Sequence, residues 1–386
     1  MIKSIEQVKN NKYDVIIVGS GISGSVAAQL LDESAYNVLI VERRNHIGGN
    51  IYTERRDDID IHKYGAHIFH TNNDEVYSYL SDFAEFNDYR HQVKAIGSDS
   101  KLYQLPFNLQ TFAEVYNRYF TVEDAKKFLN YESNTVENPS NLEEQAQSLI
   151  GKEIYEKLIK YYTEKQWGRD CKDIPASVIK RLPVRFSFDN TYFNNAKYQG
   201  IPTNGYTELI ENLTSNVDVL LNTDFVKNLS IFENMLETDG KIIYTGAVDE
   251  LCNYEFGQLE YRSLKFETEK LNQSDYQGTS VVNDCRKEVS YTRIIEHKHF
   301  NDLNSPVTYI TKEYAVEFKA GENIEPAYPI SDNKNKEAYE YYVKYLKTAK
   351  PNYLLLGRLA EYKYFDMDKA VKNTFEFLNT NFDITV

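Results

Sequence analysis

The sequence predicts an α/β fold in which a Rossmann-like domain is interrupted by a helical domain and by an antiparallel β-sheet domain. Three observations support this prediction. Residues 15–24 read VIIVGSGISG, an apolar β run that breaks into glycines and leads into a helix-forming stretch. A long region with apolar residues at helical spacing begins near residue 108, and several short β segments separated by turns follow residue 254.

Three glycines after the first strand match the dinucleotide-binding pattern, because a strand precedes them and a helix follows. Gly19 permits the tight turn, Gly21 lets the backbone approach a pyrophosphate, and Gly24 lets the helix pack closely on the strand. A second β run over 38–41 ends in Glu42, whose carboxylate can bind ribose hydroxyls and would repel a 2′-phosphate. The pattern favours FAD or NAD over NADP, and its alternative is an ordinary βαβ turn.

Helical and β periodicities predict the other elements in chain order. Helices are expected over 25–31, 75–86 and 207–213, within 108–184, and from about 366. Strands are expected within 89–105, where Gly97 marks a hairpin turn, and over 217–221, 241–245, 261–268, 279–283, 291–297, 307–311 and 353–356. In the long helical region, Gly151 marks a join between helices and Gly168 caps the end of the last one.

These elements divide the chain into three domains. The Rossmann-like domain is expected to combine 1–78, 203–250 and 323–386, with the helical domain at 108–184 and the antiparallel sheet domain at 79–107, 185–202 and 251–322. An interrupted domain that closes with a strand, Gly357, Arg358 and a helix favours FAD over NAD by analogy with flavoprotein folds. Gly48 and Gly49 indicate a second close backbone approach, on the far side of the cofactor.

Composition excludes several classes of partner. The 386 residues carry a formal net charge of −14, which would repel nucleic acid and anionic membranes, so an anionic ligand needs a local arginine cluster. No apolar run reaches the ~20 residues of a membrane-spanning helix, and residues 1–12 lack the apolar core of a secretory signal. The three widely spaced cysteines form no metal or disulfide pattern and fit a cytoplasmic protein. His67 and His70 have no acidic or cysteine partner nearby, so no metal site is expected.

Longer motifs extend over nearly the whole chain. They read GSGISG at 19–24, ERRNHIGGN at 42–50, YGAHIFHT at 64–71, YTEKQWG at 162–168, IKRLPVRFSFDNTYF at 179–193, YQGIPTNGYT at 198–207, YTRIIEHKHF at 291–300 and GRLAEYKYFDMD at 357–368. In these motifs the chain resembles the UDP-galactopyranose mutase family, flavoenzymes of nucleotide-sugar metabolism, from about residue 13 onward. One departure is Ala66, where the family usually has proline before the histidine.

The resemblance implies a redox-neutral interconversion of UDP-galactopyranose and UDP-galactofuranose, with reduced FAD as the covalent nucleophile at the anomeric carbon. It also implies a cytoplasmic homodimer that serves cell-surface polysaccharide biosynthesis. His91 stands where family members have Asn or His near the sugar, so acceptance of UDP-N-acetylgalactosamine, or a preference for it, stays open. Two further alternatives are a flavin oxidoreductase of the amine-oxidase type and a nucleotide-sugar binder without activity.

The resemblance implies the site residues as well. Arg181, on a mobile loop, and Arg293 resemble the two arginines that hold the diphosphate, and His67 resembles the histidine that faces the flavin; these three are the expected catalytic residues. Further substrate contacts are expected from Tyr162, Trp167, Tyr192, Arg262, Glu313, Tyr328, Tyr364, Asp366 and His91. Cofactor contacts are expected from Gly19, Gly21, Ile22, Ser23, Gly24, Glu42, Arg43, Gly49, Asn50, His67, Ile68, Gly357, Arg358, Asp366 and Met367.

Several of these residues also have a purely structural alternative. Trp167 can pack a helix end against the core, and Asp366 can cap the helix that begins after it. His67 can be a loop histidine with satisfied hydrogen bonds. Arg262 is a weaker candidate, because a salt bridge beside the core explains it equally well.

Overall fold

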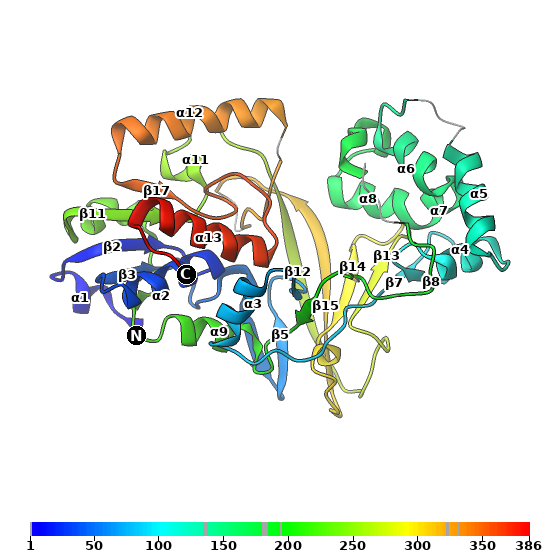
Figure 1. The fold of residues 1–386 in the computed structure, drawn as a ribbon, viewed down its shortest axis with the longest axis horizontal. Coiled ribbons are helices and arrows are strands. Elements are labelled where there is room, and N and C mark those ends of the chain that lie inside the picture. Colours follow the sequence, from blue (N-terminus) through cyan, green and yellow to red (C-terminus); the bar gives the residue numbers. More distant parts are fainter. Residues whose placement is uncertain (1, 134–137, 180–183, 194, 322–323, 331) are drawn as a thin grey trace.

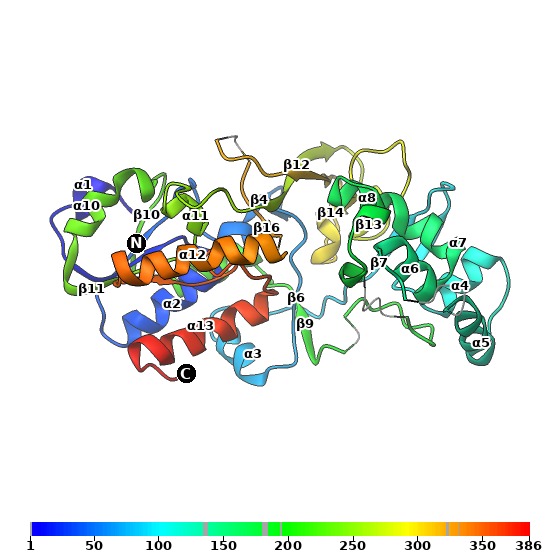
Figure 2. The ribbon, with the colours of Figure 1, turned by 90° about the horizontal axis from the view of Figure 1, so that it is seen from above.

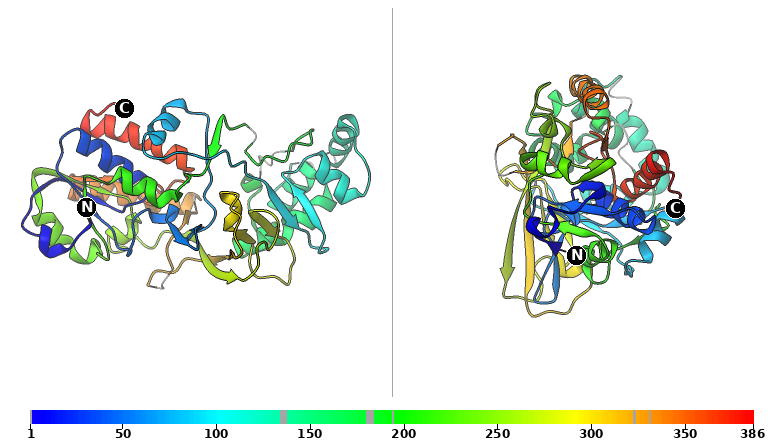
Figure 3. Two further views of the ribbon diagram at one scale, coloured as in Figure 1. Left: turned by 90° about the horizontal axis from the view of Figure 1, so that it is seen from below. Right: turned by 90° about the vertical axis from the view of Figure 1, so that its left-hand side faces the viewer.

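The computed structural model describes residues 2–133, 138–179, 184–193, 195–321, 324–330 and 332–386. A parallel sheet and its helices form one end of an elongated molecule, a larger sheet lies in the middle, and a group of helices forms the other end (Figure 1). Seen from above, the helices of residues 109–167 lie far from both ends of the chain (Figure 2). Both ends lie beside the parallel sheet in two further views (Figure 3).

The parallel sheet has six strands within the described residues, and every neighbouring pair is parallel. In spatial order they are β1 (Ile2–Lys3), β10 (Asp218–Leu220), β3 (Val38–Val41), β2 (Tyr13–Val18), β11 (Leu236–Tyr244) and β17 (Tyr353–Leu355). Side chains alternate along a strand, so Val15 and Ile17 of β2 join one apolar layer while Ile16 joins the other.

Helices cover both faces of this sheet, as parallel sheets require. The layer that contains Val15 and Ile17 also contains residues of α2 (Ile22–Glu33), α3 (Asp74–Ser81), α9 (Gly205–Leu213) and α13 (Met367–Phe382). The opposite layer contains residues of α1 (Ile5–Val8), α10 (Leu229–Asn234), α11 (Val248–Leu251) and α12 (Asn333–Ala349).

The larger sheet has seven strands within the described residues. In spatial order they are β16 (Tyr328–Pro329), β12 (Tyr261–Leu271), β15 (Thr308–Glu317), β14 (Arg293–Glu296), β13 (Val281–Asp284), β7 (Val93–Ile96) and β8 (Leu102–Leu105). Neighbours are antiparallel as predicted, except for β13 and β7, which pair in parallel. This exception arises because the β7–β8 hairpin joins the sheet from a distant part of the chain.

The helical region contains five α-helices among its described residues: α4 (Leu109–Tyr116), α5 (Val122–Ser133), α6 (Leu142–Ile150), α7 (Lys152–Ile154) and α8 (Lys160–Trp167). A π-helical turn over Tyr155–Ile159 precedes α8, and short 3₁₀ turns over Cys171–Asp173 and Ala176–Ile179 follow it. Gly151 (φ +83°) separates α6 from α7, and Gly168 (φ +68°) ends α8, which confirms both glycine predictions.

Short elements connect these regions. Two-stranded sheets pair β4 (Thr53–Arg56) with β5 (Ile59–His62), and β6 (Phe69–Thr71) with β9 (Tyr198–Gly200). Further 3₁₀ turns lie at Gly49–Ile51, Val226–Asn228 and His297–Phe300. The predicted α/β fold class is confirmed, while the residue boundaries of the three predicted domains remain our proposal.

Two element predictions need correction. The N-terminal residues, interpreted as an extension before the first strand, form strand β1 and helix α1, because Ile2 and Lys3 pair with the free edge of β10. The helix predicted over 75–86 ends at Ser81; the amide side chain of Asn73 caps its start. A third element, α12, was not predicted at all, although Asp332 caps it.

Candidate functional site

A cleft lies at the carboxyl ends of β2, β3 and β11, the edge at which open α/β sheets bind ligands. Val18, Val41 and Tyr244, the last residues of these strands, line it. The predicted cofactor residues that line this cleft are Gly19, Gly21, Ile22, Ser23, Gly24, Glu42, Arg43, Gly49, Asn50, His67, Gly357, Arg358 and Met367. Ile68 instead packs on the apolar core, and Asp366 borders a second cleft.

Two glycine loops around the cleft approach one another too closely for side chains. A Cβ atom on Gly49 would lie 2.9 Å from Cα of Gly21, and Gly49 has a φ of +52°. A Cβ atom on Gly19 would lie 2.2 Å from Oγ1 of Thr245. The second glycine pair therefore makes a close backbone approach, as predicted, and the segment that it approaches is the first glycine turn. Helix α2 begins in this turn without a side-chain cap, so its N-terminal N–H groups suit a phosphate.

Glu42 directly follows β3, and protein donors hold its carboxylate in place. The side chain is 5% exposed, and its Oε2 accepts hydrogen bonds from the backbone N–H and the hydroxyl of Ser20 at 2.9 and 2.8 Å. Its Oε1 accepts one hydrogen bond, from the backbone N–H of Arg44 at 2.9 Å. A carboxylate oxygen has two lone pairs, so Oε1 can accept a further bond from a ribose hydroxyl.

Arg43, which we predicted to contact the cofactor, is engaged by acidic side chains. Its Nη1 lies 3.2 Å from Oε1 of Glu250, and its Nη2 forms an ion pair with Glu325. Burial alone would lower the pKa of Arg43, but these two carboxylates raise it. All three residues line the cleft, so Arg43 joins the loop of Glu325 to the cofactor domain.

Arg44 lines the cleft too and was missed by the sequence analysis. Its guanidinium lies 4.3 Å from the ring centroid of Tyr64, and its Nη2 donates to Oδ1 of Asn50 at 3.0 Å. Its Nη1 is buried without a hydrogen-bond partner among the described residues, which is costly unless a ligand accepts from it. The cleft therefore fits a dinucleotide: Arg44, the glycine turns and the start of α2 suit its pyrophosphate, and Glu42 suits a ribose. The paired arginines of the ERR motif were the available signal.

His67 lies in the loop after β5 and lines the cleft. Its Nδ1 lies 2.8 Å from the carbonyl oxygen of Gly65, so Nδ1 carries the hydrogen and Nε2 does not. Its backbone N–H donates to Nδ1 of His62 at 3.2 Å. Burial, together with the charges of Arg358 and Arg293, lowers the pKa of His67 to about 4. The ring is therefore neutral at pH 7.

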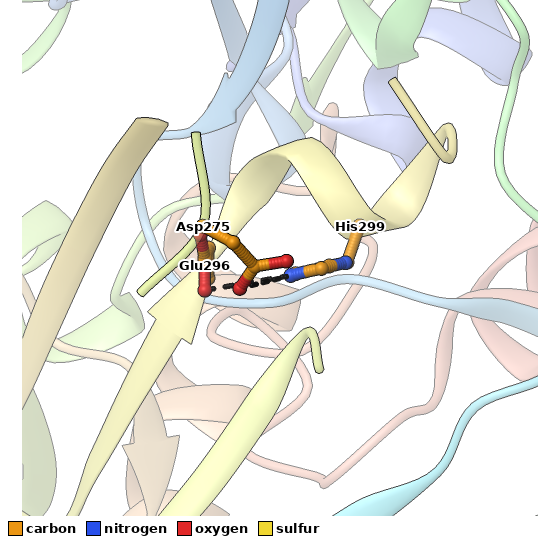
Figure 4. A group of neighbouring side chains, drawn as sticks. All are labelled: Asp275, Glu296 and His299. Atoms are coloured by element: carbon orange, nitrogen blue, oxygen red, sulfur yellow. Dashed lines mark hydrogen bonds and ion pairs between the residues drawn. The ribbon is translucent and has the colours of Figure 1, made fainter. Parts of the chain in front are cut away.

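The arrangement of histidines gives no metal site beside the cleft within the described residues. Among the described residues, one group of side chains has metal-ligand spacing. It consists of Asp275, Glu296 and His299, near the end of β14 (Figure 4). Glu296 already accepts hydrogen bonds from two backbone N–H groups, and Nε2 of His299 lies 3.4 Å from an oxygen of each carboxylate. This group is an ion-pair cluster, and neither His67 nor His70 belongs to it.

Arg293 lies in a row of side chains on one face of the larger sheet. Asn283, Arg293, Glu313 and Phe266 are directly paired across four neighbouring strands, and directly paired residues of antiparallel strands share a face. Nε of Arg293 donates to Oε1 of Glu313 at 2.8 Å. A Cβ atom on Gly65 would lie 3.2 Å from Oε2 of Glu313, so the row meets the loop that carries the cleft histidine.

Asn283 is the second residue that the sequence analysis missed. Its side-chain oxygen is buried and has no hydrogen-bond partner among the described residues, although it lies directly across from Arg293. An orphaned buried acceptor beside a guanidinium indicates that a ligand donor belongs there. The available signal was an asparagine within a β run, where this residue type is uncommon.

Helix α8 carries two of the predicted substrate residues. Burial raises the pKa of Tyr162 to about 12, and the charges of Arg293 and Glu313 act on it, so these three side chains lie together. Trp167 is the last residue of the helix and is half-buried, packed against the apolar core. The π-helical turn before α8 is a feature that often marks functional sites.

Arg262, predicted to bind substrate, lies at the C-terminal end of α8. Its Nη2 donates to the carbonyl oxygen of Gln166 at 2.5 Å, which satisfies one of the free carbonyls of the last turn. Burial lowers the pKa of Arg262, and its Nε is buried without a partner among the described residues. Arg262 therefore supports the helix end that carries Trp167. Among the described residues, Arg262 forms no salt bridge.

Arg358 lies beside two neighbouring tyrosines that were both predicted to contact substrate. Its guanidinium carbon is 5.1 Å from the ring centroid of Tyr328 and 5.2 Å from that of Tyr364, and its Nη2 donates to the carbonyl oxygen of Phe365. The hydroxyl of Tyr364 donates to Oδ1 of Asp366 at 2.8 Å. Asp366 stands at the cap position of α13, but its side chain makes no capping hydrogen bond.

A second cleft contains two of the remaining predicted residues. Tyr192 and Asp366 line it, together with His70, whose ring stacks on Phe193 with centroids 3.7 Å apart. His91 is buried beside Phe193, and burial lowers the pKa of His91 to about 3. The structure thus separates a cofactor cleft from a neighbouring polar cleft. Arg181 lies outside the described residues.

Comparisons with known proteins agree with this geometry. Residues 157–364 match the sequence profile of the UDP-galactopyranose mutase family, and residues 17–83 match that of an NAD(P)-binding Rossmann-like domain. A protein of Klebsiella pneumoniae named "Probable UDP-galactopyranose mutase" is 40% identical over 383 residues, which cover 96% of each chain.

Two further comparisons concern substrate and fold. The dTDP-fucopyranose mutase of Escherichia coli is 38% identical over 373 residues, covering 94% of this chain and 96% of that protein. A solved structure of reduced UDP-galactopyranose mutase superposes with a TM-score of 0.70, covering 96% of this chain and 94% of the other. Its sequence identity is 12%, so this match shows a shared fold.

Proposed function

Because the chain belongs to the UDP-galactopyranose mutase family, we propose that it catalyses the redox-neutral interconversion of UDP-galactopyranose and UDP-galactofuranose. The protein is an enzyme of the isomerase class, and its cofactor is FAD. Reduced FAD, when bound, supplies the nucleophile for the anomeric carbon of the sugar. The observation that carries the proposal is the Arg293–Glu313 pair, which adjoins the loop of His67 on the wall of the cofactor cleft.

Arg293 is suited to hold the diphosphate of the substrate. Glu313 engages its Nε, and within the described part of the chain its two Nη atoms have no hydrogen-bond partner. When the bond between the anomeric carbon and the phosphate oxygen breaks, negative charge grows on the diphosphate, and a guanidinium stabilises that charge. We propose Arg181 as the second cation of this clamp, from its place in the sequence motif.

We propose that the cofactor lies along the first cleft. Glu42 would bind the ribose of its adenosine, and the glycine turn with Arg44 would bind its pyrophosphate. Arg358 would stand beside the ring system, where a positive charge favours an anionic reduced flavin. His67, neutral at pH 7, would offer hydrogen bonding there without adding charge.

The nucleoside and the sugar are proposed to occupy the space between α8 and the row of Arg293. Trp167 and Tyr162 would hold the uracil, since a flat aromatic face stacks on a base at little entropic cost. The predicted contacts of Tyr192, Arg262, Glu313, Tyr328, Tyr364, Asp366 and His91 remain part of this proposal. Asn283 is added to it because it is the cross-strand partner of Arg293 and its amide oxygen has no hydrogen-bond partner in the described part of the chain.

A second nucleotide sugar has a specific observation in its favour. The E. coli dTDP-fucopyranose mutase is 38% identical to this chain, against 40% for the Klebsiella relative, so overall identity does not separate the two substrates. Thymidine lacks the ribose 2′-hydroxyl and adds a methyl group, and fucose lacks the 6-hydroxyl of galactose. A site built to bind a hydroxyl rejects a substrate that lacks it strongly. UDP-N-acetylgalactosamine remains a third candidate because of His91.

The deciding experiment compares these three sugar nucleotides. The purified yellow protein is reduced with dithionite without oxygen and given each furanose or pyranose form, and the products are separated by chromatography. We expect turnover of UDP-galactofuranose by the reduced protein only. A higher kcat/KM for the dTDP-fucose pair or for UDP-N-acetylgalactosamine would reassign the substrate. Turnover by the oxidised protein with peroxide release would indicate an amine-oxidase-type reaction instead.

We also propose a cytoplasmic homodimer that supplies cell-surface polysaccharide synthesis. The three cysteine thiols are free and buried, which suits a reducing compartment. No helix among the described residues is long and apolar enough to cross a membrane. The proposed role follows from the family, and light scattering of the purified protein would test the dimer.

A further inference from the structure

Lys165 has an unusual environment on helix α8. Its ammonium group donates hydrogen bonds to three backbone carbonyls, those of Asp284 at 2.6 Å, Tyr291 at 2.9 Å and Arg286 at 3.3 Å. An ammonium group has three N–H donors, so these carbonyls can use all of them. Asp284 is the last residue of β13, and Arg286 and Tyr291 belong to the connection between β13 and β14, so Lys165 ties this part of the sheet to the helix.

The carbonyls that Lys165 binds lie next to Asn283 and Arg293, the two residues at the centre of the proposed substrate site. Asp284 directly follows Asn283, and Tyr291 precedes Arg293 by two residues. Asn283 and Arg293 are direct cross-strand partners. We call β13, β14 and their connection the β13–β14 hairpin. The ammonium of Lys165 therefore holds this hairpin close to the amide oxygen of Asn283 and the guanidinium of Arg293.

The same helix carries the residues proposed to hold the base. Tyr162 lies three residues before Lys165 and Trp167 two residues after it. The neighbouring Cys285 adds a weak bond from its thiol to the carbonyl of Leu158, in the turn before α8. Lys165 is thus the charged contact between the helix with the aromatic residues and the hairpin with the arginine.

We propose that Lys165 is a positioning residue of the nucleotide site, which sets the separation between the base-binding end of α8 and Arg293. This inference rests on the proposed function, because it assumes that Trp167 and Arg293 hold two parts of one nucleotide. Lys165 itself needs no contact with substrate. Without the hydrogen bonds of Lys165, the helix and the hairpin can move independently. A nucleotide that contacts both must then order them on binding, which costs free energy and weakens its affinity.

The test compares UDP binding by FAD-loaded wild type, Lys165→Met, Lys165→Gln and Lys160→Met. Methionine keeps the apolar stem of Lys165 and removes its donors. Lys160 is the matched control because it lies on the same helix with its ammonium over the ring of Tyr161, and it makes no hydrogen bond to the β13–β14 hairpin among the described residues. UDP affinity is measured by calorimetry and by the emission of Trp167, the only tryptophan of the chain.

Loss of charge-assisted hydrogen bonds should raise the Kd of UDP and the KM of the sugar nucleotide about tenfold in Lys165→Met. The kcat should change less than about threefold, because no reacting group is touched. The Lys165→Gln variant has two amide donors for three carbonyls and should show an intermediate loss. The flavin content and visible spectrum should match wild type in every variant.

Outcomes separate this inference from the proposed function. A Kd for UDP in Lys165→Met equal to that of Lys160→Met would overturn the positioning role, even if both variants lost thermal stability. If Lys165→Met does not fold, an unchanged Kd in Lys165→Gln overturns it as well. Wild-type protein that binds FAD but not UDP would instead contradict the proposed function, before any variant is considered.

Discussion

Nε of Arg293 lies 2.8 Å from Oε1 of Glu313, and the two residues are direct neighbours across β14 and β15. Glu313 is 3% exposed, and burial alone would lower the pKa of Arg293, but the Glu313 carboxylate raises it. One edge of the guanidinium is therefore committed to the protein while its Nη atoms remain available to a ligand. This pair combines a structural and a proposed catalytic function.

Replacing Arg293 by methionine should separate these two functions. We expect kcat to fall about 10²–10³-fold, the range seen when a donor to developing charge is removed. Unfolding free energy should fall by about 2–4 kcal/mol because Glu313 is left buried and unpaired, with the lower values favoured by the partial exposure of Arg293.

The control is the double variant Arg293→Met, Glu313→Gln, measured by urea unfolding and by turnover. It should regain most of the stability, since no buried charge remains, but none of the activity. Wild-type turnover in either variant would contradict the role of Arg293 in holding the diphosphate. Both variants should bind FAD normally, which visible absorption checks.

Trp167→Ala should weaken the binding of free UDP about tenfold, because base stacking contributes roughly 1–3 kcal/mol. Trp167→Phe keeps an aromatic face and should lose less than the alanine variant. Trp167 also packs on the core, so both variants should unfold at lower temperature. An unchanged Kd for UDP in Trp167→Ala, measured by calorimetry below the unfolding temperature, would favour the packing role alone.

Gly49→Ala should impair cofactor binding through the backbone. The added Cβ would lie 2.9 Å from Cα of Gly21, so the two glycine loops must move apart. Gly278→Ala is the matched control, since its φ is also positive but nothing lies within 4 Å of the added atom. Both substitutions place an L-residue at a positive φ, which costs about 1–2 kcal/mol. We expect a raised Kd for FAD only in Gly49→Ala, and equal Kd values would show that the contact is irrelevant.

Glu325→Gln should speed the release of FAD. The ion pair with Arg43 joins residues 324–329 to the cofactor cleft, whose lining includes Glu325 and Pro326. Both side chains are partly exposed, so the ion pair contributes about 1 kcal/mol at most. Its loss should therefore raise the rate of FAD release by up to about fivefold. Glu337→Gln, on the exposed side of α12, is the control for charge. Flavin fluorescence after dilution measures the rate, and equal rates would argue against the contact.

The His299 cluster should make stability depend on pH. Hydrogen bonding and charge interactions with Glu296 and Asp275 raise the pKa of His299 in the folded protein. Its contribution is therefore complete below the unfolded pKa, about 6.5, and is lost as pH rises through the folded pKa. His299→Gln should destabilise the protein at pH 5.5 and have little effect at pH 9, as measured by urea unfolding. Equal destabilisation at both pH values would show that charge is not involved.

Local pattern was sufficient for the elements whose cause lies within a few residues. The turn after β2 and the helix ends at Gly151 and Gly168 follow from backbone sterics that glycine relieves, because Gly19, Gly151 and Gly168 all have a positive φ. Helix α12 escaped detection because its buried face is made by tyrosines such as Tyr342, whose hydroxyl obscures the apolar periodicity. Strand β1 escaped it because two residues form a strand only beside an existing edge.

The site shows the same division. Arg293, His67 and Glu313 were predicted by motif, but the contact between Arg293 and Glu313 became evident only from strand register. Asn283, across from Arg293, and His62, which accepts from the backbone of His67, were not predicted at all. The contacts of Arg293 join neighbouring strands, and the contact of His67 with His62 closes a loop. Neither composition nor periodicity carries that information.

By itself, the sequence determined the fold class, the glycine turns and the chemical types of residue available for a diphosphate. Only the tertiary structure decided that Arg43 turns to acidic partners while Arg44 keeps a donor without a partner among the described residues, and that an asparagine stands across from Arg293. The physical reason is that local steric preferences act within a few residues, whereas these electrostatic neighbours arise when separate strands and loops pack together.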